Sequence, residues 1–217
     1  MKWEIAKALI LSPHTDDMEL GAGATIRKLV ENGVQVKSIV FSDCKKSVDT
    51  SKYPIDVLRK ECKAAAGHLG IDDPTILEFP VREFPKYRQE IEEEIYKLRE
   101  TIKPDLIIAP WSKDLHQDHR TVGEEAIRAF MRSSINLWAY QLPGTCFGFI
   151  PQVFIPVSDD EVDKKIEMLQ CYQSQVERRD YFRPEKIRSF LSQVGSFINS
   201  DYAEGFADVR LVFNDVA

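Results

Sequence analysis

Short apolar runs alternate with amphipathic stretches along the first half of the chain. The runs have the length of strands and occupy residues 6–11, 35–42, 75–80 and 105–110. Between and after them, apolar residues recur every three or four positions and predict helices over 25–33, 55–69, 89–102 and about 121–131. Glycine or proline closes the first three of these stretches, which is typical of helix ends.

This alternation predicts a parallel sheet built from right-handed strand–helix–strand connections. The run at 105–110 is continuously apolar, as interior strands of parallel sheets are. In such sheets, ligands bind in the crevice beyond the carboxyl ends of the strands. The long polar loop at 43–54 follows the second strand, so we expect it to leave the sheet at that edge and to be functional.

The last third of the chain is less regular. Strands are expected over 135–142 and 152–157, with a proline–glycine pair turning the chain between them. A serine followed by two aspartates predicts an N-cap at residue 158, and that helix runs to about residue 173. A further helix is predicted over 184–198, where proline occupies the first position. No linker divides the sequence, so we expect a single domain over residues 1–217.

Two clusters of histidine and aspartate directly follow predicted strands. The first cluster comes after the first strand and contains His14, Asp16 and Asp17. The second comes after the fourth strand and contains His116, Asp118 and His119. Parallel strands bring both clusters to the same edge of the sheet. Because histidine and aspartate are common zinc ligands, the pattern predicts a metal site there.

A catalytic zinc commonly takes three protein ligands and keeps a fourth position for water. His14 and Asp17, with one histidine of the second cluster, supply three ligands. Asp16 can then point away from the metal and take the proton of the attacking water. The other histidine, protonated, would stabilise an oxyanion or protonate a leaving amine. Asp118 lies beside both histidines and can orient one of them and raise its pKa.

Each of these residues also has an ordinary structural interpretation. Paired aspartates ahead of a helix commonly cap it, and a histidine in a loop is commonly solvated. The occurrence of both clusters at strand ends favours the metal site over these alternatives. Gly21 and Gly23 do not complete a dinucleotide-binding G-x-G-x-x-G motif, because Ile26 occupies the third glycine position.

Composition narrows the class of partner and the compartment. The net charge of −6 argues against a nucleic-acid binder, which needs a basic surface. No run approaches the roughly 20 apolar residues that span a bilayer, and the first residues lack the features of a secretory leader. The four cysteines form no C-x-x-C pair, which is typical of reduced thiols. We therefore expect a soluble, cytoplasmic domain.

The two clusters resemble the paired motifs of a known family. PHTDDMELGAGATI is similar to the first motif, HPDDxExG, of the LmbE-like (PIG-L) family of zinc-dependent N-acetylglucosamine deacetylases, and HQDHRTV is similar to its second motif, HxDH. Weaker similarities follow the same order, namely LRKECKAAAGHLGI, KPDLIIAPW, IEMLQCYQSQ and YAEGF. The resemblance covers nearly the whole chain. It implies an α/β, LmbE-like fold with a Rossmann-like, mostly parallel sheet flanked by helices in three α/β/α layers.

The resemblance also implies roles for individual residues. Zinc, or another divalent first-row metal, would be held by His14, Asp17 and His119. Asp16 would be the general base, and His116 the electrostatic stabiliser or general acid. Asp118 would hydrogen-bond a site histidine. Arg59 matches a position where family members place an arginine that contacts substrate, and Glu19 matches the glutamate of the first motif, expected to support the helix start.

Two departures from the family pattern concern the first turn and the substrate. Thr15 replaces the usual proline but leaves the three polar groups in place. The loop at 42–54 reads SDCKKSVDTSKYP and lacks the glycine-rich acidic sequence, often TDGE-like, that is common after the second strand. Since that loop is expected to border the substrate pocket, the acetylated sugar is expected not to be a simple one.

The sequence therefore predicts a zinc-dependent hydrolase that removes an N-acyl group, most simply acetyl, from an amino sugar or glycoconjugate. Two alternatives remain open. The same centre would serve hydrolysis of another amide or an ester, and a metal-binding module could recognise a sugar without cleaving it. The aromatic side chains at 138–149 are interpreted as sheet core, with a homo-oligomer interface as the alternative.

Overall fold

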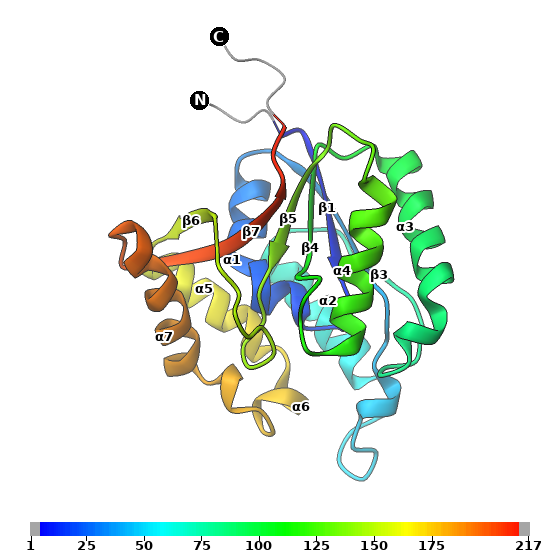
Figure 1. Cartoon of the computed structure of the whole chain (residues 1–217). Helices are drawn as coiled ribbons and strands as arrows, with labels where there is room; N and C mark the ends of the chain where they lie inside the picture. The colour runs from blue at the N-terminus through cyan, green and yellow to red at the C-terminus, as the bar shows by residue number, and fades with distance from the viewer. Residues whose placement is uncertain (1–4, 213–217) are drawn as a thin grey trace.

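The computed structural model describes residues 5–212. They form a seven-stranded sheet with helices on both of its faces (Figure 1). The strands lie in the order β3-β2-β1-β4-β5-β7-β6. Neighbours from β3 to β5 pair in parallel, whereas β7 is antiparallel to β5 and to β6. The strands are β1 (Lys7–Ser12), β2 (Gln35–Val40), β3 (Thr75–Ile76), β4 (Leu106–Pro110), β5 (Asn136–Tyr140), β6 (Val153–Val157) and β7 (Tyr202–Arg210).

Two layers of helices cover the sheet. One contains α1 (Asp17–Glu31), α2 (Val57–Leu69), α5 (Asp159–Gln170) and α7 (Pro184–Gly195), and the other contains α3 (Arg88–Ile102) and α4 (Gln117–Phe130). Shorter helical segments are α6 (Gln173–Val176), η1 (Lys45–Ser47), η2 (Phe84–Tyr87), η3 (Asp180–Phe182) and η4 (Ser196–Ile198). Side chains of β1 alternate between two apolar clusters, Ala8 with the first layer and Leu9 with the second. The predicted three-layer α/β/α fold is confirmed.

The central position of β1 places the two polar clusters side by side. β1 pairs in parallel with β4, and Ile10 of β1 lies opposite Ile108 of β4. Both strands are almost completely buried. Because they run in the same direction, their carboxyl ends lie at the same edge of the sheet. The segments that follow them, residues 13–16 and 111–116, therefore leave the sheet next to each other.

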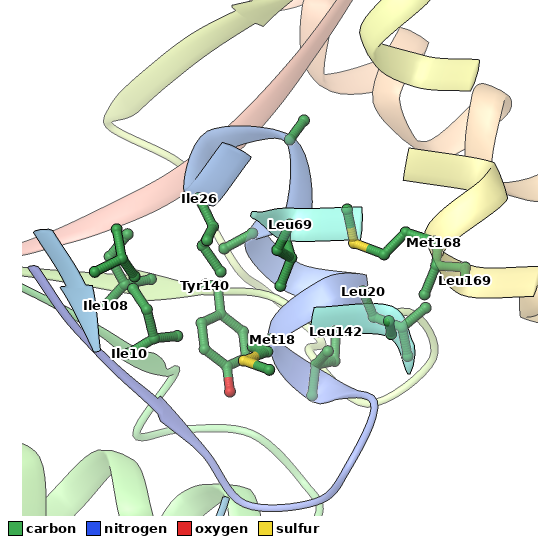
Figure 2. Close-up of a cluster of buried hydrophobic side chains, with 14 of the residues drawn as sticks. Ile10, Met18, Leu20, Ile26, Leu69, Ile108, Tyr140, Leu142, Met168 and Leu169 are labelled. Atoms are coloured by element: carbon green, nitrogen blue, oxygen red, sulfur yellow. The ribbon is translucent and has the colours of Figure 1, made fainter. Parts of the chain in front are cut away.

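The helix after β1 begins earlier than predicted, at Asp17 rather than at residue 25. The second half of the first motif is thus helix and packs against the sheet. A Cβ atom at Gly21 would lie only 2.3 Å from the ring of Tyr140, so glycine is needed for this close approach. Figure 2 shows that ring within the apolar cluster beside Met18. Helix α4 likewise begins at Gln117, not at residue 121, which places His119 in its first turn.

The largest departure from prediction is β7, which the periodicity does not indicate. It pairs with β5 on one side and with β6 on the other, so the expected strands at 135–142 and 152–157 are not neighbours. Helix α5 ends at Gln170, and the α-helix of α7 ends at Gly195, both short of the predicted ends. Trp138 and Tyr140 are core residues, as favoured, whereas Phe147 is 73% exposed.

A buried ion pair ties β7 to the layer of helices. Lys165 of α5 and Glu204 of β7 are 3% and 2% exposed, with Nζ and Oε1 2.5 Å apart. Glu204 also accepts hydrogen bonds from the backbone N–H groups of Ala24 and Thr25 in α1, and Lys165 donates to the carbonyl of Leu20. In a regular helix, the N–H of Ala24 and the carbonyl of Leu20 are partners. The ion pair thus anchors the backbone of α1 to both α5 and β7.

Within residues 5–212, no helix combines the length and apolar character needed to cross a membrane.

Candidate metal centre and active site

The site forms where two strand–helix junctions meet. In the first, His14 follows β1, Asp16 occupies the N-cap of α1, and Asp17 is the first residue of that helix. In the second, His116 occupies the N-cap of α4, and His119 lies in its first turn. The hydroxyl of Ser12 fixes the first junction, because it donates to the carbonyl of His14 and accepts from the backbone N–H of Met18. The structure thus brings the two predicted clusters together.

Three ligand-type atoms converge on one point. His14 Nδ1 lies 3.0 Å from Asp17 Oδ2 and 3.1 Å from His119 Nε2, and His119 Nε2 lies 3.4 Å from Asp17 Oδ2. Ligands that bind one zinc ion tetrahedrally at about 2.0–2.2 Å are separated by about 3.3–3.6 Å. His14, His116 and His119 also form a group that could hold a metal, with ligand atoms within 4.8 Å of one another. The separations within the set containing Asp17 are shorter.

Two buried carboxylates hold the remote nitrogens of the converging histidines. Asp118 Oδ2 lies 3.0 Å from His14 Nε2, and Asp114 Oδ2 lies 3.0 Å from His119 Nδ1. A carboxylate in this position fixes which ring nitrogen carries the proton and leaves the other with its lone pair toward the metal. The donor set therefore fits a divalent metal ion. Asp118 acts on His14 here, whereas Asp114 was not among the predicted site residues.

The two carboxylates are themselves anchored. The backbone N–H groups of Arg82 and Phe84 donate to Asp118 at 2.5 Å and 3.2 Å, and these bonds help to lower its pKa despite burial. Arg82 has φ of 66°, a left-handed conformation that is uncommon for a residue other than glycine. Asp114 accepts from the Thr145 hydroxyl at 2.8 Å. Each histidine orientation thus depends on a segment distant in sequence.

Strong electrostatic coupling accompanies this geometry. Burial by itself lowers the pKa of His14, but the carboxylates of Asp17 and Asp118 outweigh it and hold that pKa well above its ordinary value. Burial raises the pKa of Asp17, but His119 and His14 outweigh it and hold that pKa well below the ordinary value. Asp17 is therefore a carboxylate in this setting, the form that binds metal.

Asp16 differs from a simple helix cap. It occupies the N-cap position of α1, yet its side chain makes no capping hydrogen bond. The carboxyl group is half-buried and lines the same cavity as His14, Asp17 and His119. Burial and the neighbouring charge of Asp17 raise its pKa to about 6. The alternative interpretation of Asp16 as a capping residue therefore does not account for its side chain.

The surroundings of His116 favour its neutral imidazole. Its Nδ1 accepts a hydrogen bond from the backbone N–H of Asp118 at 3.2 Å, which leaves the ring proton on Nε2. Burial and the charges of His119 and His14 lower its pKa to about 4. The expected protonated histidine is thus not what this setting favours. A neutral ring still donates one hydrogen bond, from Nε2.

The converging groups line a cavity of about 300 Å³. The loop after β2 contributes Cys44 and Ser47 to the lining, as expected for a functional loop. Polar and aromatic groups that the prediction missed also line the cavity: Arg82, Gln175, Arg179 and Tyr181. Gln175 ends the IEMLQCYQSQ segment, which is one of the weaker family similarities, whereas no local pattern marks the other three. The unusual φ of Arg82 is a structural sign of a constrained position.

Two other predicted residues lie outside this lining. Arg59 of α2 lies 3.4 Å from the exposed Glu78 and 3.9 Å from the largely buried Asp43, and the contact with substrate stays a prediction. Glu19 is fully buried on α1, and burial raises its pKa well above the ordinary value. Its buried position in the first turn of α1 agrees with a supporting rather than a catalytic role.

The fold and the site define a class: an α/β protein whose clustered histidines and aspartate could hold a metal ion, with a further carboxyl group, that of Asp16, in the same cavity. Residues 9–130 match the PIG-L family, described as GlcNAc-PI de-N-acetylase. This match spans both motifs and more than half of the chain. The protein belongs to the PIG-L family.

Individual relatives extend the similarity beyond the matched segment. Diacetylchitobiose deacetylase of Thermococcus kodakarensis is 26% identical over 231 residues, covering 97% of this chain and 85% of the relative. The structure of N,N'-diacetylchitobiose deacetylase from Pyrococcus horikoshii superposes with a TM-score of 0.80 and 23% identity, over 94% of this chain and 84% of that one. GalB, the 4-carboxy-2-hydroxymuconate hydratase of Pseudomonas putida KT2440, superposes with a TM-score of 0.74 and 20% identity, over 97% and 99% of the two chains.

Proposed function

We propose that this protein is a metal-dependent N-deacetylase of an amino sugar or glycoconjugate. The proposal rests on the different surroundings of two adjacent carboxyl groups, those of Asp16 and Asp17. Asp17 lies within 3.4 Å of two histidine nitrogens, whereas Asp16 makes no capping bond and faces the same cavity. Membership of a de-N-acetylase family and similarity to a diacetylchitobiose deacetylase support this reaction.

His14, Asp17 and His119 are the proposed metal ligands, and zinc is the proposed ion. Nitrogen and carboxylate ligands with short mutual separations suit zinc, although other first-row divalent ions accept the same ligands. When bound, the ion supplies Lewis-acid polarisation of the amide carbonyl and lowers the pKa of water. Asp118 and Asp114 orient the two histidines for this purpose.

Asp16 is the proposed general base. As a carboxylate it takes a proton from the attacking water while the water oxygen bonds to the amide carbon. When the carbon–nitrogen bond breaks, the same carboxyl group returns this proton to the amine nitrogen. Acetate and a free amine leave, and Asp16 is ready for the next cycle. One residue thus serves as base and then as acid.

His116 is the proposed stabiliser of the oxyanion. With Nδ1 occupied by a backbone N–H, only Nε2 is available to donate a hydrogen bond. A neutral donor directed at a developing negative charge stabilises the transition state without having to be protonated. This assignment keeps the predicted role of His116 but changes its charge state.

The substrate would bind between the loop after β2 and the segment around α6. Arg82, Gln175 and Arg179 line the cavity and offer hydrogen-bond donors suited to sugar hydroxyls or an anionic substituent. Their side chains provide the polar groups that fix the orientation of a small ligand.

The test is acetate release from N-acetylglucosamine, its methyl glycoside and N,N'-diacetylchitobiose by the zinc-loaded protein. Asp16→Asn is expected to lower the rate by about 10²–10⁴-fold, because it removes acid–base catalysis. Bound metal, measured by elemental analysis, should stay at the wild-type level, since Asp16 is not a proposed ligand. His119→Ala should lose both metal and activity. Full activity in the Asp16→Asn variant would refute the role of Asp16.

A second candidate is hydrolysis of another amide or of an ester at the same centre. The hydratase GalB shares the fold, so the fold by itself does not define the reaction. A panel of N-acyl amines and acetate esters distinguishes these cases by their products. Metal binding without any product would favour the non-catalytic sugar-binding module.

We also propose a cytoplasmic location, which the four free thiols support. The possible homo-oligomer stays a prediction.

A further inference from the structure

A second cavity adjoins the proposed active site and has a different chemical character. It has a volume of about 420 Å³ and lies among α1, α5, α7 and the segment after β5. Its apolar lining includes Leu20, Leu169, Ile187, Phe190 and Leu191. We refer to it as the side cavity. Its volume is within the range of sites that bind small ligands.

The side cavity lies next to the catalytic cavity. Leu20, Pro143 and Tyr181 line both cavities. Leu20 comes one turn after Asp16 and Asp17 in α1, so one helix carries the catalytic carboxylates and part of the apolar wall. Figure 2 shows Leu20 and Leu169 close to each other in the apolar cluster. An elongated ligand that passes these shared residues would reach from one cavity into the other.

The polar groups of the side cavity are either paired or at its mouth. Lys165 lines the cavity, but its ammonium already contacts Glu204 and the carbonyl of Leu20. Asp180, Lys186 and Ser189 are solvent-exposed. Within the described residues, the cavity therefore offers no buried, unpaired charge to bind a charged ligand group. Its aliphatic and aromatic side chains favour the binding of an apolar group, because apolar surface is then removed from water.

We propose that the side cavity binds an apolar alkyl or aryl group of the substrate whose amide is cleaved in the catalytic cavity. This inference rests on the proposed function and narrows its substrate class to amphipathic amino-sugar conjugates. The apolar group is either an aglycone attached to the sugar or an extended N-acyl chain. It agrees with the departure of the loop at 42–54 from the usual sequence, which indicates that the substrate is not a simple acetylated sugar.

The test compares the methyl and hexyl glycosides of N-acetylglucosamine, with N-hexanoylglucosamine and N-acetylglucosamine as the second pair. Full burial of one methylene group is worth about fourfold in kcat/KM. Partial burial of a hexyl chain should therefore raise kcat/KM by about tenfold or more in one of the two pairs. A gain with the hexyl glycoside identifies an aglycone, and a gain with the hexanoyl amide identifies an acyl chain.

Ser189→Phe places a bulky ring at the mouth of the cavity, and Phe190→Ala removes part of its wall. Both variants should bring the ratio of kcat/KM values within each pair to about threefold or less. Ser192→Phe is the matched control on the same helix, because Ser192 is exposed and does not line the cavity. Melting temperatures establish that the variants are folded.

The outcomes separate this inference from the proposed function. Amide hydrolysis without a preference for the hexyl glycoside or the hexanoyl amide overturns the side cavity as a subsite and leaves the deacetylase in place. An equal loss of preference in Ser192→Phe also overturns it. If no compound is cleaved, calorimetry on both pairs decides. Binding of the hexyl or hexanoyl compound about tenfold tighter than its short-chain partner, lost in Ser189→Phe, supports the subsite against the proposed reaction. Equal binding within both pairs overturns both proposals.

Discussion

Asp16 and Asp17 are adjacent in the chain, but their carboxyl groups have different surroundings. Asp17 accepts the backbone N–H of His14 at 2.8 Å and lies against two histidine rings, which stabilise its charge. Asp16 lacks these contacts, and burial next to a charged neighbour favours its neutral form. The pKa values of the two groups are thus shifted in opposite directions. Such divergence is typical of carboxyl pairs in which one group is electrostatic and the other exchanges protons.

At the same scale, Asp114 is expected to determine metal affinity without touching the metal. Its carboxylate hydrogen-bonds to His119 Nδ1 and accepts hydrogen bonds from the Thr145 hydroxyl and the His116 backbone N–H. Asp114→Asn should weaken metal binding by about 10–100-fold, as loss of such partners commonly does. Competition with a chelator of known affinity measures this. Asp73→Asn is the matched control, since Asp73 pairs with Lys63 on the surface. Unchanged affinity in Asp114→Asn would show that His119 needs no carboxylate partner.

Helix α4 depends on a close approach to the strand that precedes it. A Cβ atom at Gly123 would lie 2.5 Å from the carbonyl oxygen of Pro110 and 2.9 Å from the backbone of Ser112. The neighbouring atoms belong to the backbone of the segment that leads to His116, so they cannot move independently of the site. The small size of residue 123 therefore positions the second motif.

Gly123→Ala should lower the free energy of unfolding by about 1–3 kcal/mol, because overpacking forces the helix away from the strand. Urea denaturation measures the change. Gly67→Ala in α2 is the control, since a Cβ there meets no atom within 4 Å. That substitution should stabilise the protein by about 0.5–1 kcal/mol through helix propensity. Equal effects of the two substitutions would contradict the close approach.

The pair formed by Lys165 and Glu204 acts between elements. Lys165→Met leaves the Glu204 carboxylate buried with only its two backbone donors, and the expected cost is about 3–5 kcal/mol. Lys164→Met changes the neighbouring, more exposed lysine, which pairs with Asp160. Its effect should stay below about 1 kcal/mol, as for other surface pairs. Similar urea midpoints for the two variants would refute the structural role of the buried pair.

At the scale of the whole molecule, the proposed metal ligands join two separate segments. His14 and Asp17 come from the β1–α1 junction, and His119 comes from α4. A ligand that binds only the folded state stabilises it, by about 2.7 kcal/mol at a free concentration of 100 times Kd. For a chain of this size, that corresponds to an increase in Tm of about 5–11 °C.

Zinc added to the metal-free protein should therefore raise Tm by this amount, and a chelator should reverse the change. His119→Ala should remove most of the response, whereas the exposed His68→Ala should keep it. Differential scanning calorimetry provides the measurement. The same increase in Tm for His119→Ala and the wild type would exclude His119 as a ligand.

Much of this protein follows from its sequence alone. The period of apolar residues defined most of the strands and helices, because each element must bury one face and the spacing of its apolar residues reflects that. The order of strand and helix then implied a parallel sheet, and a parallel sheet brings the residues after its strands to one edge. Two His/Asp motifs after strands were therefore enough to predict a shared site.

Tertiary structure decided what depends on contacts between distant residues. Glu204 reaches Ala24 across 180 positions, and Asp118 reaches His14 across 104. Such contacts leave no local period, so the insertion of β7 between β5 and β6, the role of Asp114 and the side cavity were not predictable. The lowered pKa of His116 likewise depends on burial and on neighbouring charges that only the folded chain assembles. Local patterning specified the elements and their chemistry, and packing specified their partners.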